Sequence, residues 1–242
     1  MPDALFEHPR LVAVYDALEA DRPDLDVYAA VADELGARRV LDIGCGTGVL
    51  AVALAAGGRE VTGVDPAAGS IAHARRRPGG ERVRWIHGDA SAVGDLGADL
   101  AVMTGNAAQA VVEPTDWAIV LRGAHRALRP GGHLVVETRD PARRAWEEWI
   151  PQRSRRRAEV PGAGVVESWS ELVDVDLPLV TFRTTYVFAA DGARLTSDST
   201  LRFRERDEVG ADLVGHGFVL DEVRDAPDRP GRELVFLAHR AS

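Results

Sequence analysis

The sequence contains almost no cysteine, since Cys45 is the single one among 242 residues. An intramolecular disulfide is therefore excluded, and we expect no metal site built on cysteine and assign no metal. The acid-rich N-terminus lacks the apolar core of a signal peptide, and no uncharged apolar run approaches the ~20 residues that span a bilayer. These absences predict a cytoplasmic protein with no membrane partner.

The sequence also lacks an excess of positive charge. Its 38 acidic residues outnumber 29 basic ones, which gives a formal net charge of −9. This balance disfavours a broad polyanion-binding surface, so we expect no nucleic-acid partner. The local basic run RSRRR at residues 153–157 is most simply a solvated loop, and reception of an acidic substrate is the alternative.

Between residues 38 and 139 the sequence alternates strand and helix patterns. Short apolar runs that predict strands occur at residues 38–44, 60–65, 82–89, 98–105 and 133–139. The segments between them show helical spacing of apolar residues, and two more helical patterns lie within residues 11–35. Strands that alternate with helices indicate a parallel sheet covered on both faces.

The pattern changes after Asp140. A short helix is expected over residues 141–150, and a polar segment follows it. Three extended runs come next, at residues 165–176, 179–190 and 193–204, and the last two flank a hairpin signal at Asp191-Gly192. This insert is typical of an antiparallel sheet with one half-buried face. A helix over residues 206–218 and strands at residues 219–226 and 233–240 close the chain.

Three glycines, Gly44, Gly46 and Gly48, alternate in the loop between the first predicted strand and its helix. Such a loop offers unpaired N–H groups, and glycines let a ligand approach the backbone. Asp65 ends the next strand about 20 residues on, the spacing of a carboxylate that holds ribose hydroxyls. These residues imply an adenosine-type cofactor. A tight turn without ligand, and a helix N-cap role for Asp65, are the alternatives.

The glycine spacing distinguishes between cofactors. A dinucleotide fingerprint needs its third glycine where this chain has Val49, which disfavours NAD or FAD. The stretch VLDIGCGTG at residues 40–48 instead resembles the first motif of the class I S-adenosylmethionine-dependent methyltransferases. Asp65 matches their ribose-binding acid, GDA at residues 88–90 matches their adenine-contacting motif, and LRPGGHLVVE at residues 128–137 is similar to their late motif.

This resemblance, which covers roughly residues 38–139, implies S-adenosylmethionine as cofactor and S-adenosylhomocysteine as product. It implies one α/β domain with a doubly wound, Rossmann-like, seven-stranded and mostly parallel sheet, interrupted by the antiparallel β insert after the fifth strand. The expected parts are an N-terminal helical lid, the cofactor-binding core, the insert as substrate cap or dimer contact, and the closing helix with two strands. Their ranges are residues 1–37, 38–140, 141–205 and 206–242.

The cofactor-binding residues are expected in the loops that follow the first four strands. They are Asp42, Gly44, Cys45, Gly46, Gly48, Asp65, Pro66, Gly88, Asp89, Ala90, Thr104 and Gly105. Cys45 is expected to be a small buried residue rather than a nucleophile. Pro66 departs from the bulky residue that often follows the ribose acid in this family, and Ile86 is the candidate to contact the adenine instead. A turn role is the alternative for Asp89.

The acceptor is expected at the carboxyl ends of the fourth and fifth strands. Asn106 and Gln109, together with Trp146 and Trp149 spaced three residues apart on one helix face, are the predicted substrate-binding residues. Core packing of the two tryptophans and a loop-capping role for Asn106 are the alternatives.

The predicted catalytic residues are Glu137, Tyr15 and Arg139. Glu137 is the candidate general base, because an unpaired buried carboxylate at a strand end is costly without a role. Arg139 would orient or mask it, or pair structurally with Glu137 or Asp140. Tyr15 would close the lid over the site, with simple helix packing as the alternative.

The leading interpretation is methyl transfer, by in-line displacement, to an oxygen or nitrogen nucleophile of a small-molecule acceptor. No N-P-P-Y-like motif follows the fourth strand, where TGNA stands at residues 104–107, which argues against the DNA and protein-glutamine methyltransferases. A non-catalytic module that binds S-adenosylmethionine, another reaction in the same pocket and, less favoured, an NAD-dependent oxidoreductase are the alternatives. The acceptor, its attacking atom and the choice of monomer or homodimer stay open at this stage.

Overall fold

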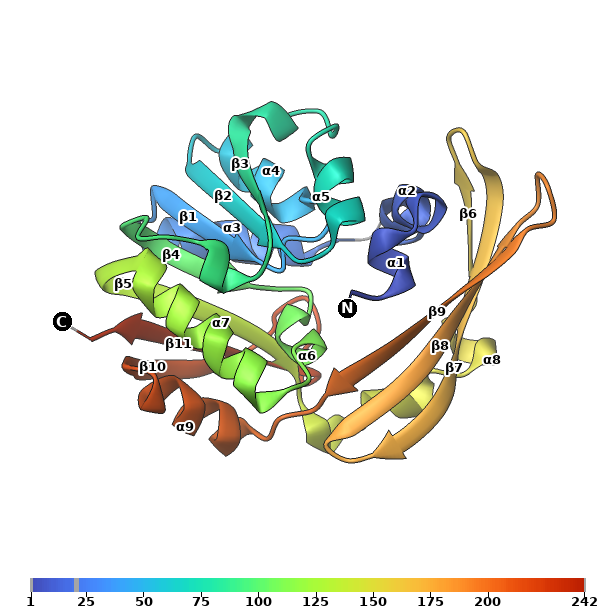
Figure 1. The fold of residues 1–242 in the computed structure, drawn as a ribbon. Helices are drawn as coiled ribbons and strands as arrows, with labels where there is room; N and C mark the ends of the chain where they lie inside the picture. Colours follow the sequence, from blue (N-terminus) through green and yellow to red (C-terminus); the bar gives the residue numbers. More distant parts are fainter. Residues whose placement is uncertain (1, 20–21, 242) are drawn as a thin grey trace.

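The computed structural model describes residues 2–19 and 22–241, and two β-sheets dominate it (Figure 1). Residues 1, 20 and 21 of the expected lid, and residue 242 of the expected closing segment, lie outside this description. The larger sheet has seven strands in the order β10-β11-β5-β4-β1-β2-β3. These strands are β1 (Arg39–Ile43), β2 (Glu60–Asp65), β3 (Val83–His87), β4 (Ala98–Met103), β5 (Leu128–Arg139), β10 (Phe218–Asp225) and β11 (Glu233–Arg240).

Strands β1 to β5 are mutually parallel, and β11 runs antiparallel to both of its neighbours, β5 and β10. The central strands read as continuous apolar runs because helices cover both faces of the sheet. This confirms the predicted doubly wound, Rossmann-like fold. The chain winds from β1 outward to β3 and then returns to β4, so the strand order reverses between β1 and β4. Ligands of such folds bind outside the carboxyl ends of the strands at this switch point.

Different helices cover the two faces of the main sheet. One apolar cluster joins the sheet to α3 (Asp24–Glu34) and α4 (Val49–Ala56), and the other joins it to α6 (Ala107–Ala110), α7 (Pro114–Ala127) and α9 (Arg206–Gly215). Helix α5 (Ala68–Ala74) packs against β2 and β3. Within the described ranges, no helix combines the length and the apolar character needed to cross a membrane.

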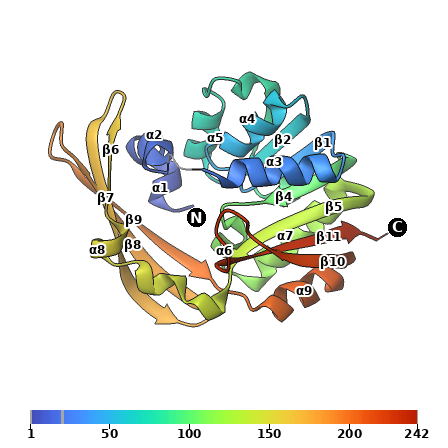
Figure 2. The same cartoon turned by 180° about the vertical axis from the view of Figure 1, so that it is seen from behind.

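The second sheet is antiparallel and has the order β6-β7-β8-β9. Its strands are β6 (Arg156–Val160), β7 (Gly164–Asp176), β8 (Leu179–Phe188) and β9 (Arg194–Arg202). The N-terminal helices α1 (Ala4–Glu7) and α2 (Pro9–Leu18) lie between this sheet and the main sheet in both views (Figures 1 and 2). Leu11 and Val14 of α2 pack against Val166 and Phe188 of the second sheet, so α2 is joined to the insert by an apolar core.

The expected helix over residues 141–150 is wrong. Two 3₁₀ turns, Pro141–Arg143 and Ala145–Glu148, occupy this segment instead. Arg144 between them adopts a left-handed conformation with a φ of 47°, which interrupts a continuous helix. The two tryptophans of this segment therefore do not share a regular helix face.

The arginines of residues 153–157 are exposed, as a solvated run predicts, but the loop assignment is wrong because part of this run forms the edge strand β6. A short helix, α8 (Pro151–Ser154), precedes β6. Arg156 pairs in register with Ser168 of β7, forms an ion pair with Glu19 and donates to the Leu18 carbonyl. Edge strands tolerate charged residues, so the apolar pattern that reveals a buried strand is missing here.

Candidate active site

The three glycines of the loop after β1 have different neighbours. All three are left-handed, with φ values of 72°, 53° and 82° for Gly44, Gly46 and Gly48. A Cβ at Gly48 would lie 2.4 Å from the Trp85 ring, and one at Gly44 would lie 2.6 Å from the Cβ of Ala107. A Cβ at Gly46 would meet nothing within 4 Å. Protein packing therefore explains two of the glycines, and the space in front of the loop is open only at Gly46.

Asp65, at the end of β2, fixes the shape of this loop. One carboxylate oxygen accepts a 2.8 Å hydrogen bond from the Gly46 amide, and the other accepts a 2.8 Å bond from the Ala67 amide ahead of α5. The side chain is only 8% exposed, and burial raises its pKa above the ordinary value despite these two bonds. Each oxygen retains a lone pair, so the same carboxylate remains able to accept from ribose hydroxyls.

Asp42, near the end of β1, is a buried carboxylate with an unsatisfied oxygen. It is 2% exposed, and its Oδ2 atom has no hydrogen-bond partner in the described structure. Burial, followed by repulsion from Asp65, raises the pKa of Asp42 to about 7. A buried polar atom without a partner indicates a missing donor. The unsatisfied acid, the open space at Gly46 and the clamped loop together fit a ligand that carries hydroxyl or ammonium donors.

The N-terminal helices are tied to this loop by contacts that sequence reasoning missed. The Thr47 hydroxyl donates a 2.6 Å hydrogen bond to Asp16 of α2, and Arg77 also binds the Asp16 carboxylate. Glu7 accepts from the Ala68 and Gly69 amides at 2.9 and 3.1 Å. Residues of α1 and α2 therefore brace both turns that surround Asp65. No local pattern signals these contacts, because their partners are 31 or more residues apart in the chain.

The residues expected at the adenine end lie beside Asp65. The Gly88 amide donates to the Asp65 carbonyl at 2.9 Å. Asp89 is exposed and accepts a 2.7 Å bond from the Ser91 amide, which is the turn role given above as its alternative. Ala90 is fully buried. An adenine contact of this segment therefore stays a prediction.

Three other residues named for the cofactor differ in exposure. Pro66 is exposed and Ile86 is half-buried, so both present surface beside β2 and β3. Cys45 is buried, and burial raises the pKa of its thiol well above the ordinary value. A thiol with a raised pKa is a poor nucleophile, which agrees with the expectation of a small buried residue.

The structure brings together the polar residues predicted after β4 and β5. After β4, Thr104 is half-buried and Gly105 is exposed, and the next residue, Asn106, is buried in a left-handed conformation with a φ of 62°. Gln109 is fully buried, and its Oε1 atom accepts a 3.0 Å hydrogen bond from Arg139. Two atoms of this group, Asn106 Oδ1 and Gln109 Nε2, are buried without a partner. These unsatisfied atoms lie after β4, where the acceptor is predicted to bind.

Glu137 is fully buried among groups that the sequence did not predict. Tyr28 of α3 donates its hydroxyl to the Glu137 carboxylate, and Arg229 lies 3.5 Å away. Burial, followed by repulsion from Glu233, raises the pKa of Glu137 to about 8. The expected pairing with Arg139 is not made, since Arg139 binds Gln109. The role of Glu137 as general base stays a prediction, and it would start from the protonated form at neutral pH.

The aromatic residues named for the site also differ in burial. Tyr15 is half-buried with its ring edge-on to Phe6, and burial raises its pKa to about 12. Trp146 is 2% exposed with its ring centroid 4.6 Å from that of Phe203, so it is a core residue. Trp149 is half-buried against Phe182 and retains surface for a ligand.

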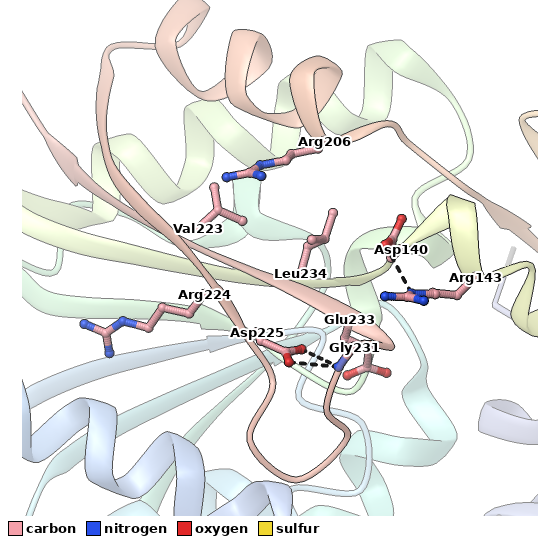
Figure 3. Close-up of a pocket in the computed structure, with 9 residues that line it drawn as sticks. All are labelled: Asp140, Arg143, Arg206, Val223, Arg224, Asp225, Gly231, Glu233 and Leu234. Atoms are coloured by element: carbon pink, nitrogen blue, oxygen red, sulfur yellow. Dashed lines mark hydrogen bonds and ion pairs between the residues drawn. The ribbon is translucent and has the colours of Figure 1, made fainter.

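A separate hollow of about 300 Å³ lies between the start of α9 and the β10–β11 turn (Figure 3). Arg206 and Asp225 line it. Glu233 also lines it and accepts a hydrogen bond from the Asn106 side chain. The Gly231 amide binds Asp225 at 2.8 Å inside it. None of the glycines after β1 lines this hollow, so it is distinct from the candidate cofactor site.

Comparison with known proteins agrees with this geometry. Residues 40–132 match the family model described as a methyltransferase domain. Over 102 residues the chain is 37% identical to the ubiquinone biosynthesis O-methyltransferase of Azorhizobium caulinodans, a match that covers 41% of this chain. The chain spans only 40% of the length of that relative.

Solved structures match over nearly the whole chain. A S-adenosylmethionine-dependent methyltransferase from Clostridium acetobutylicum superimposes with a TM-score of 0.77 at 15% identity, over 96% of this chain and 98% of that one. An S-adenosylmethionine-bound amino pentose methyltransferase from Micromonospora echinaspora gives a TM-score of 0.69 at 24% identity, over 94% and 97%. At such identities the likeness shows the fold alone. The motifs, the family model over residues 40–132 and the fold agree, and this part of the chain is similar to the methyltransferase domain of class I S-adenosylmethionine-dependent enzymes.

Proposed function

We propose that this protein transfers a methyl group from S-adenosylmethionine to an oxygen or nitrogen nucleophile of a small-molecule acceptor. The observation that carries the proposal is the Asp65 carboxylate bound to the Gly46 amide at 2.8 Å, beside open space at Gly46. This arrangement is a rigid loop that exposes backbone donors next to a carboxylate, which suits an adenosine-type ligand.

The residues that would hold the cofactor are on the carboxyl ends of β1 and β2. Asp65 would accept from the ribose hydroxyls, and the unsatisfied Oδ2 of Asp42 would accept from a donor of the ligand. When bound, S-adenosylmethionine supplies an electrophilic methyl group on a sulfonium. The protein then has to align the nucleophile and exclude water. Asp16 and Glu7 support exclusion of water by bracing the N-terminal helices on the site.

The acceptor would lie at the ends of β4 and β5, near Gln109 and Arg139, with Tyr15 on the side of α2. A hydroxyl or ammonium nucleophile must lose a proton during transfer. The raised pKa values of Tyr15, to about 12, and of Glu137, to about 8, keep both groups protonated at neutral pH in this structure. Glu137 is the better candidate base, because a pKa of about 8 leaves a minor fraction of its carboxyl deprotonated at neutral pH, and only that form accepts a proton.

The comparisons support a small molecule as the acceptor. One relative is named for the O-methylation of ubiquinone biosynthesis, and one structure for an amino pentose. These names differ in the attacking atom, so the proposal includes both oxygen and nitrogen.

The proposal is tested in two steps. Calorimetry should show binding of S-adenosylmethionine and S-adenosylhomocysteine, and binding of NAD instead of either would overturn the family-based function. A panel of quinols, phenols, amino sugars and other small amines is then screened for formation of S-adenosylhomocysteine. Cofactor binding without turnover across the panel would favour the alternative of a non-catalytic binding module.

A further inference from the structure

Arg139, the last residue of β5, is a half-buried cation with no acidic partner among the described residues. Its guanidinium donates a 3.0 Å hydrogen bond to the neutral Gln109 side chain. In the part of the chain that the structure describes, each nearby acid is within ion-pair distance of another arginine. Asp140 pairs with Arg143, and both Glu137 and Glu233 pair with Arg229. Arg139 therefore has donors left over after its protein contacts.

A buried donor without a partner in the described ranges, the Nε2 atom of Gln109, lies beside Arg139. Gln109 is fully buried, its Oε1 atom is used by Arg139, and its Nε2 atom has no partner among the described residues. Burial also lowers the pKa of the Arg139 guanidinium, as expected for a cation removed from water. Removal of polar donors from water without acceptors is costly. The buried Gln109 donor without an acceptor in the described structure, next to the half-buried Arg139 guanidinium, therefore indicates an acceptor group that a ligand brings.

The neighbouring surface is aromatic. The Arg139 guanidinium carbon lies 5.6 Å from the centroid of the Trp149 ring, and the Trp149 and Phe182 rings are 4.5 Å apart. Both rings are half-buried, unlike Trp146 behind them. A planar guanidinium binds a carboxylate in a fork of two hydrogen bonds, and aromatic rings favour a flat apolar neighbour.

We propose that Arg139 and Gln109 bind a carboxylate of the methyl acceptor, while Trp149 and Phe182 contact the apolar ring that carries it. The acceptor is thus an aromatic carboxylic acid. This inference rests on the proposed function, because it assigns the substrate class of that same site.

The cofactor's own carboxylate is a poor candidate for this role. The cofactor loop follows β1, and β4 separates β1 from β5 in the sheet. Arg22 is the arginine whose charge lowers the pKa of Asp42, near the end of β1. Arg139 is instead grouped with Gln109 and Trp149, on the acceptor side.

The probe is phenylacetate, with the neutral phenylacetamide as its matched control. Each is titrated by NMR into the protein saturated with S-adenosylhomocysteine. We expect phenylacetate to bind about tenfold more tightly than the amide, because the carboxylate offers two charged oxygens to the donors while the amide offers a single neutral one. Arg139→Gln should remove this preference and leave amide binding and S-adenosylhomocysteine affinity within about twofold. Arg139→Lys should retain part of the preference, because the charge remains without the fork.

Arg122→Gln is the control variant, since Arg122 is an exposed arginine of α7, and it should behave as the parent protein. Equal binding of acid and amide by the parent protein would overturn the inference, and so would an unchanged preference in Arg139→Gln. A loss of S-adenosylhomocysteine affinity in that variant, with the preference intact, would assign Arg139 to the cofactor. Failure of the parent protein to bind S-adenosylhomocysteine would instead count against the proposed function. If Arg139→Gln does not fold, Arg139→Lys is measured in its place, and an undiminished preference for the acid in that variant would overturn the inference.

Discussion

The Asp16 carboxylate of α2 accepts a 2.6 Å hydrogen bond from the hydroxyl of Thr47 in the glycine loop. This contact joins the N-terminal helices to the loop that is proposed to hold the cofactor. Helix α2 packs at the same time on the second sheet, so one helix connects the cofactor loop with the insert. Helix α2 therefore contacts both the insert and the glycine loop.

Replacement of Asp16 by Asn should weaken binding of S-adenosylhomocysteine by about three- to tenfold, because loss of one charge-assisted contact loosens the loop. Isothermal titration calorimetry measures this change. Asp26→Asn, at an exposed position on α3, is the matched control and should leave the affinity unchanged. Equal affinities in both variants would show that α2 does not support the loop.

Replacement of Asp65 by Ala should cost about 1–3 kcal/mol of cofactor binding free energy, because the ribose hydroxyls and the Gly46 amide both lose an acceptor. Asp65→Asn should lose less, since its side-chain oxygen still accepts one of these bonds. Calorimetric titration with S-adenosylmethionine distinguishes the two variants. If Asp65→Ala binds S-adenosylmethionine with the same affinity as the parent protein, Asp65 is not a cofactor-binding residue.

Gly46→Val and Gly48→Val form a matched pair, since both glycines have positive φ and carry a similar backbone penalty of about 1–2 kcal/mol. At Gly46 the new side chain enters the open space, so cofactor binding should be lost while the protein stays folded. At Gly48 it would collide with Trp85, so the thermal unfolding temperature should fall further. Thermal melts and calorimetry of both variants test this difference. If Gly46→Val binds the cofactor with the same affinity as the parent protein, the prediction is contradicted.

Stability should decrease with pH through Glu137. Its pKa is raised from 4.5 to about 8, so between these values the folded state holds a proton that the unfolded state has released. The free energy of unfolding contributed by this group is thus complete below pH 4.5 and is lost as pH rises through about 8. Glu137→Gln cannot titrate, so its melting temperature should fall less between pH 5 and pH 9 than that of the parent protein. Glu81→Gln, at an exposed site, should keep the parental pH dependence.

The same variant tests the predicted base. If Glu137 removes a proton in the rate-limiting step, Glu137→Gln should slow turnover by about 10²-fold with little change in cofactor affinity. Turnover within about twofold of the parent enzyme would leave Glu137 a purely structural role, as the buried partner of Tyr28 and Arg229.

The alternation of strands and helices in the main sheet follows from local patterns, which is why this part of the fold could be predicted. Apolar runs bounded by glycine and acidic residues determine β1 to β5, and the motif around Gly46 and Asp65 marks the switch point. Two predictions failed where local signals conflict with their surroundings. The segment after Pro141 has helical composition but is interrupted at Arg144, and the charged strand β6 has no apolar pattern.

The sequence by itself determined the fold class, the cofactor loop and its carboxylate, because residues close together in the chain carry those signals. Only the tertiary structure decided which groups contact each other across the sheet. In the structure Glu137 contacts Tyr28 and Arg229, and Arg139 forms a hydrogen bond with Gln109. Trp146 is buried, and Asp16 accepts a hydrogen bond from Thr47. Each of these pairings joins segments that are distant in the chain. The protonation state of the side chains and the donors they leave unpaired therefore depend on burial in the fold, and not on local spacing in the sequence.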